Sequence, residues 1–211
     1  MAEQSKSRPT PAAPDAPDVS RRRLVAWLWR LPVLAALAGA GFGAREVWRI
    51  HFNKPAPADP PTFEPREPVT VAPLAHFEAP WSVREFVFDG RPCLALRLPV
   101  AIPGALVVPD VQAPEGEGGE LVLAGFSRIC THQGCLVDLN RDVEAIAFAF
   151  NHRGERPKLT CACHYSVFDP SRAGRVVSGP AVLPLPRVRL RLESDDGTRT
   201  VVADGRERTT S

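Results

Sequence analysis

The chain has 211 residues, of which 44% are hydrophobic, and a formal net charge of +2. This is enough apolar material for one folded domain of ordinary size plus a further segment. Much of the small positive excess lies near Arg21, Arg22 and Arg23 rather than in a stripe along the chain. This distribution argues against nucleic acid as a partner.

The first fifty residues predict a membrane anchor. Residues 1–19 are rich in Pro, Ala and Asp, and we expect them to form a disordered cytoplasmic tail. Within 20–50, basic residues precede an apolar run of 21 residues from Leu24 to Ala44, interrupted only by Arg30. As a helix this run reaches ~31 Å, about one hydrocarbon core. The excess of arginine before it predicts a single-pass helix in the plasma membrane of a prokaryote, with the folded domain on the exported side.

The same segment resembles an export signal. Ser20-Arg21-Arg22-x-Leu24-Val25 resembles the twin-arginine signal, which carries folded, cofactor-containing proteins across the membrane. The cleavage site offered by Ala38-Gly39-Ala40 is weak, so we expect an uncleaved signal anchor. A soluble amphipathic helix fits poorly, because no polar face recurs along 31–44.

Residues 51–73 contain seven prolines, a density that predicts an extended hinge linker with neither helix nor sheet. Residues 74–205 then show short runs of alternating polarity separated by turn residues, which predict an all-β, antiparallel domain. We expect no helix after residue 50. "EAIAFAFN" and "KLTCAC" are interpreted as a hairpin, and 206–211 as a C-terminal tail.

Two blocks hold four of the five cysteines: "CTHQGC", residues 130–135, and "CACHYS", residues 161–166. C-x-H and C-x-x-H together offer two thiolates and two imidazoles to a metal centre. Cys135 and Cys163 are then spare, and on an oxidising side of the membrane they should form a disulfide. A structural zinc site is the alternative, although C-x-H is an unusual zinc spacing. Plain disulfides would leave both histidines unexplained. The fifth cysteine, Cys93, is expected to be buried in a strand.

The two blocks resemble the two boxes of the Rieske iron–sulfur proteins, of the quinol:cytochrome c reductase type. "SGPAVLPLPRVRLRL", residues 178–192, is similar to the proline-containing loop and following strand of that family. The resemblance covers roughly residues 70–205. It implies a Rieske-like antiparallel β-sandwich whose tip, formed by two loops, binds one [2Fe–2S] cluster per subunit.

The resemblance also implies a role for each box residue. Cys130 and Cys161 would hold one iron, and His132 and His164 the other. Cys135 and Cys163 would form the disulfide, and Ser166 would donate a hydrogen bond to a bridging sulfide. His164 would be the catalytic residue that hydrogen-bonds a quinol and accepts its proton. The implied partners are the membrane, quinol, and cytochrome b and cytochrome c-type subunits.

Three positions depart from the family pattern: Ala162 replaces a proline, Tyr165 a glycine and Phe168 a tyrosine. The usual tyrosine hydroxyl donates to a ligand sulfur, so Phe168 predicts a lower reduction potential. An aromatic residue after the second-box histidine also resembles the small Rieske subunit of arsenite oxidases. An exported molybdenum oxidase of that kind is therefore a second interpretation. A soluble Rieske ferredoxin for a ring oxygenase is disfavoured, because those proteins lack both the disulfide pair and the export segment.

Overall fold

The computed structural model describes residues 19–109 and 119–208, in two compact units divided between Arg45 and Glu46. The tail expected over 1–19 lies, except for its last residue, outside the described part. Each unit is described by itself below.

The first unit is helical. Helix α1 (Val19–Leu28) is followed, after a break at Trp29, by α2 (Arg30–His51), whose C-terminal residues belong to the second unit. Pro32 lies in the first turn of α2, where the missing N–H costs nothing. Together Ser20–His51 is long and apolar enough to cross a membrane, and none of its apolar window is buried. This confirms the expected N-terminal apolar helix as a candidate span.

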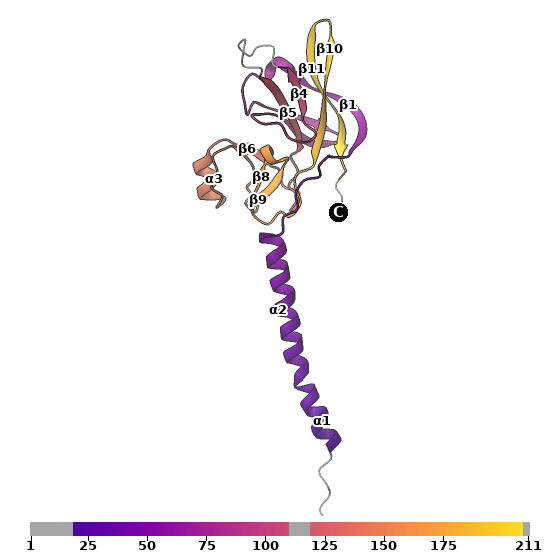
Figure 1. Cartoon of the computed structure of the whole chain (residues 1–211), viewed down its shortest axis with the longest axis vertical. Helices are drawn as coiled ribbons and strands as arrows, with labels where there is room; N and C mark the ends of the chain where they lie inside the picture. The colour runs from indigo at the N-terminus through magenta and orange to yellow at the C-terminus, as the bar shows by residue number, and fades with distance from the viewer. Residues whose placement is uncertain (1–18, 110–118, 209–211) are drawn as a thin grey trace, which may run out of the picture. The chain divides into compact units, whose positions relative to one another are not determined.

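The second unit is a β-domain of two antiparallel sheets (Figure 1). The large sheet has the strand order β1-β11-β10-β5-β3-β2, and β4 pairs with β5. Its strands are β1 (Phe63–Pro73), β2 (Val83–Phe88), β3 (Arg91–Leu98), β4 (Leu106–Pro109), β5 (Glu120–Ser127), β10 (Arg187–Asp195) and β11 (Thr198–Glu207). A short 3-10 helix, η1 (Leu74–His76), follows β1.

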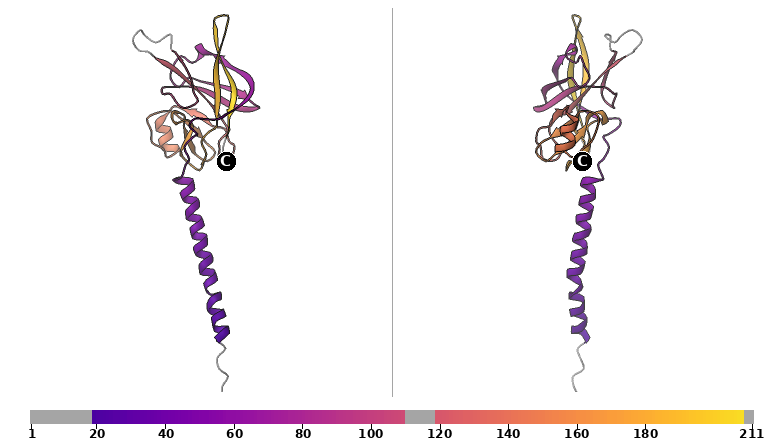
Figure 2. Two further views of the ribbon diagram at one scale, coloured as in Figure 1. Left: turned by 45° about the vertical axis from the view of Figure 1, so that its right-hand side comes forward. Right: turned by 90° about the vertical axis from the view of Figure 1, so that its left-hand side faces the viewer.

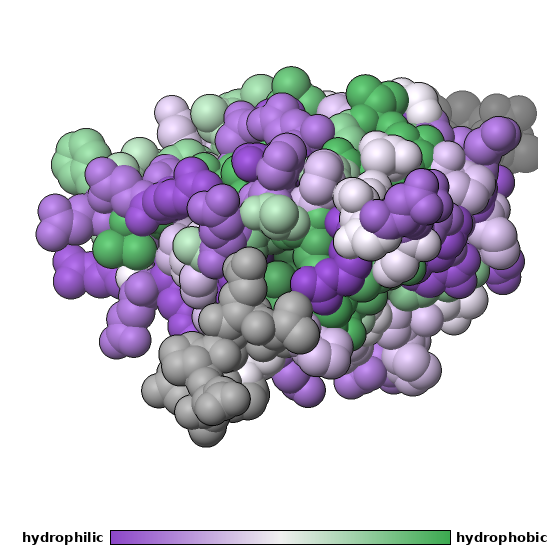
Figure 3. Space-filling model, turned by 90° about the horizontal axis from the view of Figure 1, so that it is seen from above, coloured by the Kyte–Doolittle hydropathy of each residue, from purple (hydrophilic) through white to green (hydrophobic). Residues whose placement is uncertain are grey.

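The small sheet has the order β6-β7-β8-β9. Its strands are β6 (Asp138–Asn140), β7 (Lys158–Cys161), β8 (Ser166–Asp169) and β9 (Arg175–Ser178), accompanied by α3 (Val143–Ala149) and η2 (Pro170–Arg172). Within the β-domain, the small sheet and α3 lie at the end opposite the β10–β11 turn (Figure 2). Seen from the β10–β11 end, hydrophilic residues cover much of the surface, with smaller apolar areas between them (Figure 3).

The large sheet contributes to two cores, one on each face, because successive residues of a strand point to opposite faces. On β3, Leu94, Leu96 and Leu98 join the core that contains Leu159 and Phe168 of the small sheet. The alternating residues Cys93 and Ala95 join the second core, on the other face. The prediction of an all-β, antiparallel sandwich is thus confirmed, and Cys93 is buried in a strand as expected.

The expected linker is shorter than 51–73, because Phe63–Pro73 forms β1 and pairs with β11. Proline lacks the backbone N–H that hydrogen bonds between strands require. The many prolines in 51–73 therefore predicted that no sheet would form there. β1 lies at the end of the strand order and pairs on one side only, and its register shifts between Pro65 and Val69. Edge strands and bulges are the places where a sheet tolerates proline.

Two expectations are wrong here, a strand at "EAIAFAFN" and the absence of any helix after residue 50, because these residues form most of α3. Asp142 caps the helix by accepting hydrogen bonds from the backbone N–H groups of Glu144 and Ala145, at 3.0 and 2.9 Å. Asp142 before an apolar segment is a recognisable helix start, but the alternating "AIAFAF" pattern concealed it. The sequence also did not indicate β6 or β8, and β11 continues to Glu207, beyond the expected end of the domain at residue 205.

Candidate metal centre

Three loops meet at the small sheet. The first loop (residues 130–136) follows β5, the second loop (162–165) joins β7 to β8, and the third loop (179–186) joins β9 to β10. The Thr131 hydroxyl donates to the Leu183 carbonyl at 2.6 Å, which ties the first loop to the third. The first block lies in the first loop, and the second block comprises the second loop with the strand residue on either side of it.

The first loop turns back tightly on itself. The Gly134 N–H donates to the Cys130 carbonyl at 2.9 Å, and the Cys130 N–H donates to the Cys135 carbonyl at 2.8 Å. Gly134 has a φ of +78°, which glycine adopts without steric cost. This turn places Cys130 in the core, 3% exposed, while His132 is half-buried at the loop surface.

The second loop and the strand ends beside it carry the residues of the second block. Cys161 at the end of β7 pairs with Ser166 at the start of β8, and both are buried. The intervening residues, including His164, are exposed. The rings of His132 and His164 lie 4.9 Å apart between centroids, in an edge-to-face arrangement at 86°. The structure therefore brings together the two histidines that the sequence singled out.

Two of the four cysteines in the blocks, Cys130 and Cys161, are free thiols and lie next to each other. Burial raises the pKa of the Cys130 thiol, an effect partly opposed by the backbone N–H of His132. Among the described residues, His132 Nδ1 is a buried ring nitrogen without a hydrogen-bond partner. Buried polar atoms normally have partners. Two buried thiols and two imidazoles, one of which has an unsatisfied ring nitrogen, fit a metal centre.

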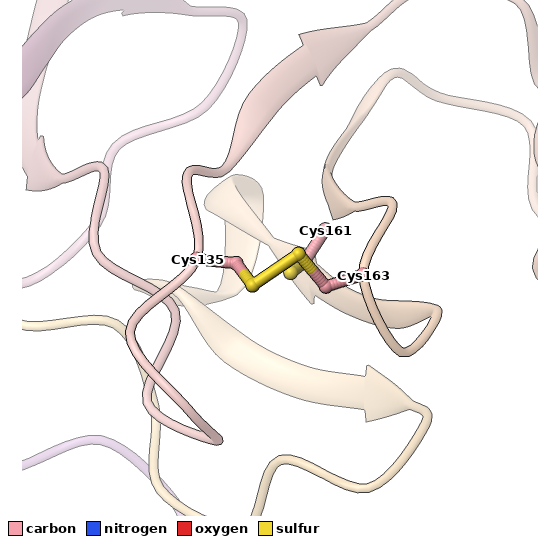
Figure 4. A group of neighbouring side chains, drawn as sticks. All are labelled: Cys135, Cys161 and Cys163. Atoms are coloured by element: carbon pink, nitrogen blue, oxygen red, sulfur yellow. A yellow bond between two sulfur atoms is a disulfide. The ribbon is translucent and has the colours of Figure 1, made fainter.

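Cys135 and Cys163 form a disulfide between the first and second loops, with Cα atoms 6.5 Å apart (Figure 4). The predicted pairing is confirmed. The sulfur atoms of Cys135, Cys161 and Cys163 lie within 4.8 Å of one another. They do not form a three-thiolate metal site, because two of them are bonded to each other. The disulfide instead holds the two loops together beside Cys161.

The third loop packs on the second. Gly179 has a φ of +82°, and a Cβ at this position would lie 2.4 Å from the carbonyl oxygen of Tyr165. The Ala181 N–H donates to Ser166 Oγ at 3.1 Å. Ser166 is 0% exposed, and because its oxygen accepts this bond its own proton remains available to a group in the site.

Two features of the site were not anticipated. Tyr165 adopts a φ of +60° and its ring packs edge-to-face on Phe150, the residue after α3, at 5.7 Å. The Lys54 ammonium donates to the carbonyl oxygens of Gly179 and Ala181 in the third loop. For Tyr165, the only signal in the sequence was that it replaces the glycine of the family pattern. For Lys54 there was no signal, because its partners are far away along the chain.

Comparison with known proteins decides the nature of this arrangement. Residues 105–189, which include all three loops, match the family described as "Rieske [2Fe-2S] domain". The chain carries a Rieske [2Fe–2S] domain. A domain of this family, with buried free cysteines and a disulfide at its tip, is consistent with one [2Fe–2S] cluster, as predicted.

Named relatives match the Rieske domain rather than the whole chain. A putative respiratory nitrate reductase subunit Rieske of Haloferax mediterranei is 32% identical over 36% of this chain and 30% of its own length. The cytochrome bc1 complex Rieske iron-sulfur subunit of Streptomyces lividans is 31% identical over 40% and 42%. The cytochrome b6-f complex iron-sulfur subunit of Prochlorococcus marinus (strain AS9601) is 35% identical over 37% and 36%. The match thus spans less than half of each relative.

Proposed function

We propose that this protein is a membrane-anchored electron-transfer subunit, which takes an electron and a proton from a quinol and passes the electron to a cytochrome c-type haem. The observation that carries the proposal is that two loops joined by a disulfide carry two neighbouring free thiols and two neighbouring imidazoles. Relatives named as subunits of cytochrome bc1 and b6-f complexes support the choice of partners, cytochrome b and a cytochrome c-type subunit.

In this proposal Cys130 and Cys161 hold one iron and His132 and His164 the other. Bound there, a [2Fe–2S] cluster supplies one-electron redox chemistry, at a potential raised by the two neutral imidazoles. The unsatisfied Nδ1 of His132 supports its assignment as a ligand. The burial that raises the pKa of Cys130 disfavours a bare thiolate, so a metal cation is the partner that would stabilise this residue as a ligand.

His164 is the residue that meets the quinol. It is exposed, whereas His132 is half-buried, so His164 is the more accessible of the two to a substrate at the surface. An imidazole nitrogen that faces solvent can accept a hydrogen bond from a quinol hydroxyl and then its proton. Ser166 is fixed through Ala181 and offers its hydroxyl proton inward. The Cys135–Cys163 disulfide keeps the two ligand-bearing loops together.

The N-terminal helix supplies the anchor. Ser20–His51 would cross the plasma membrane of a prokaryote once, as an uncleaved twin-arginine signal anchor, with the Rieske domain on the exported side. The disulfide supports this orientation, because disulfides persist on the oxidising side of the membrane.

A second candidate is an accessory electron-transfer subunit of an exported molybdenum oxidase. Tyr165, the aromatic residue after His164, supports it, and so does a relative named as a putative respiratory nitrate reductase subunit Rieske.

The test uses the native complex in its membrane. We expect quinol-driven reduction of cytochrome c by the wild type, a loss of more than ~100-fold in His164→Gln, and normal activity in His76→Gln, whose side chain is exposed in η1. Iron content is measured in parallel. Membranes in which quinol reduces no cytochrome while arsenite or another inorganic donor does so would favour the second candidate.

A further inference from the structure

The linker that follows the anchor helix is bound to the redox tip by a lysine. Lys54 is the third residue after α2 ends at His51, and its Nζ donates to the carbonyl oxygen of Gly179 at 2.7 Å and to that of Ala181 at 2.6 Å. These two carbonyls flank Pro180 in the third loop. Both bonds have a charged donor, which makes them stronger than bonds between neutral groups.

The backbone of the linker is held at two further points. Arg175 on β9 donates to the Lys54 carbonyl at 3.4 Å, and Arg187 on β10 donates to the Ala58 carbonyl at 2.6 Å. Linker residues and residues 183–186 of the third loop line the same shallow hollow. Residues 54–58 therefore lie along the third loop.

The Lys54 contact is partly withdrawn from water. Burial lowers the pKa of the Lys54 ammonium, as expected for a cation whose hydration is replaced by protein carbonyls. With two carbonyl acceptors at short distance the ammonium is well satisfied, so this position of the linker is a specific one.

The carbonyls that Lys54 holds belong to the segment that fixes Ser166. The Ala181 N–H donates to Ser166 Oγ at 3.1 Å, and both residues are fully buried. At Gly179 the third loop packs tightly on the second, because even a methyl group there would overlap the backbone of Tyr165 and Ser166. A displacement of residues 179–181 would therefore move the donor that orients the Ser166 hydroxyl.

We propose that Lys54 is a positioning residue of the redox site: docked on Gly179 and Ala181, it holds the third loop in place and, through Ala181, the Ser166 hydroxyl. The position of the Ser166 hydroxyl therefore depends on whether Lys54 is bound to the third loop. Release of Lys54 would loosen the Ser166 contact, while Arg187 would still hold the linker at the Ala58 carbonyl. This role toward Ser166 rests on the proposed function.

The test compares the full-length protein with Lys54→Met, Lys54→Arg and Arg84→Met. Methionine keeps much of the length of lysine but cannot donate, arginine keeps the charge and the donors, and Arg84 is an exposed cation on β2 that serves as the matched control. Two quantities are measured: hydrogen exchange of the backbone amides of 178–182, and the electron paramagnetic resonance spectrum of the reduced protein.

We expect Lys54→Met to speed exchange in 178–182 by ~10-fold, as the net loss of about one hydrogen bond predicts, and to shift the g values of the reduced spectrum. Lys54→Arg should restore both, and Arg84→Met should change neither. Unchanged exchange in Lys54→Met would overturn the docking role. Faster exchange with an unchanged spectrum would overturn the positioning role. A wild type without the spectrum would overturn the proposed function instead, before any variant is compared.

Discussion

Gly179 packs against Ser166 so closely that a Cβ on residue 179 would lie 2.5 Å from the Ser166 Cα. Cβ atoms in proteins do not make contacts this short. The atoms on the Ser166 side belong to the backbone, so they cannot rotate away as a flexible side chain could. The third loop therefore approaches the second at a distance that only glycine permits.

We expect Gly179→Ala to lower the free energy of unfolding by ~3 kcal/mol, the sum of the positive-φ cost and the overlap. Gly197→Ala is the matched control: its φ is +80°, but the space around it is open. It should lose only ~1 kcal/mol. Denaturant unfolding of both variants measures the difference, and equal losses would show that the close approach is absent.

The disulfide should contribute strongly to stability. Cys135 and Cys163 are 28 residues apart, and closing a loop of this length is worth ~3 to 4 kcal/mol in the chain-entropy model. We expect the double variant Cys135→Ala/Cys163→Ala to lose this amount in denaturant unfolding and to lose iron faster than wild type. Cys93→Ala, which removes a thiol from the other core, should leave iron retention unchanged. Equal stability of the double variant and wild type would mean that the loops are held by other contacts.

Phe168 should lower the reduction potential. It is fully buried on β8, opposite Leu159 on the strand that ends in Cys161. In Phe168→Tyr a hydroxyl that donates to a ligand sulfur would favour the reduced state by ~1 kcal/mol, or ~40 mV for one electron. Redox titration measures this rise. Phe148→Tyr adds a hydroxyl to a side chain that is 94% exposed and should leave the potential unchanged. A potential in Phe168→Tyr that does not rise contradicts the prediction.

Cys93 should be unreactive in the folded protein. Burial raises the pKa of its thiol to about 11, from an ordinary value of 9.0. At pH 8 the thiolate fraction falls ~100-fold, so alkylation should be at least that much slower than in denatured protein. Because the folded pKa is the higher one, the contribution of this thiol to stability is complete below pH 9 and is lost as the pH rises toward 11. Mass spectrometry of alkylated peptides gives the rates, and equal rates would contradict burial.

The two boxes could be recognised in the sequence because the spacing of their residues is local. Cys130, His132, Cys161 and His164 stand at fixed spacings, and the two left-over cysteines form the expected disulfide. The strands of the large sheet from β2 onward were also predictable, because alternating residues pack into the two cores on its opposite faces.

The rest depends on tertiary structure. Helix α3 was not recognised because "AIAFAF" alternates in polarity as a strand does. The N-terminal cap formed by Asp142 favours the helix. β1 was concealed by its prolines, which only an edge position tolerates. No local pattern could reveal that Lys54 binds carbonyls 125 and 127 residues away.

The central claim is mixed thiolate and imidazole ligation by the two boxes. Its most direct test is the electron paramagnetic resonance spectrum of the reduced protein, recorded for the full chain in its membrane together with iron and zinc analysis. We predict a signal of low average g from one [2Fe–2S] cluster per chain, lost in Cys130→Ser. A reduced protein that gives no signal and contains stoichiometric zinc would contradict it.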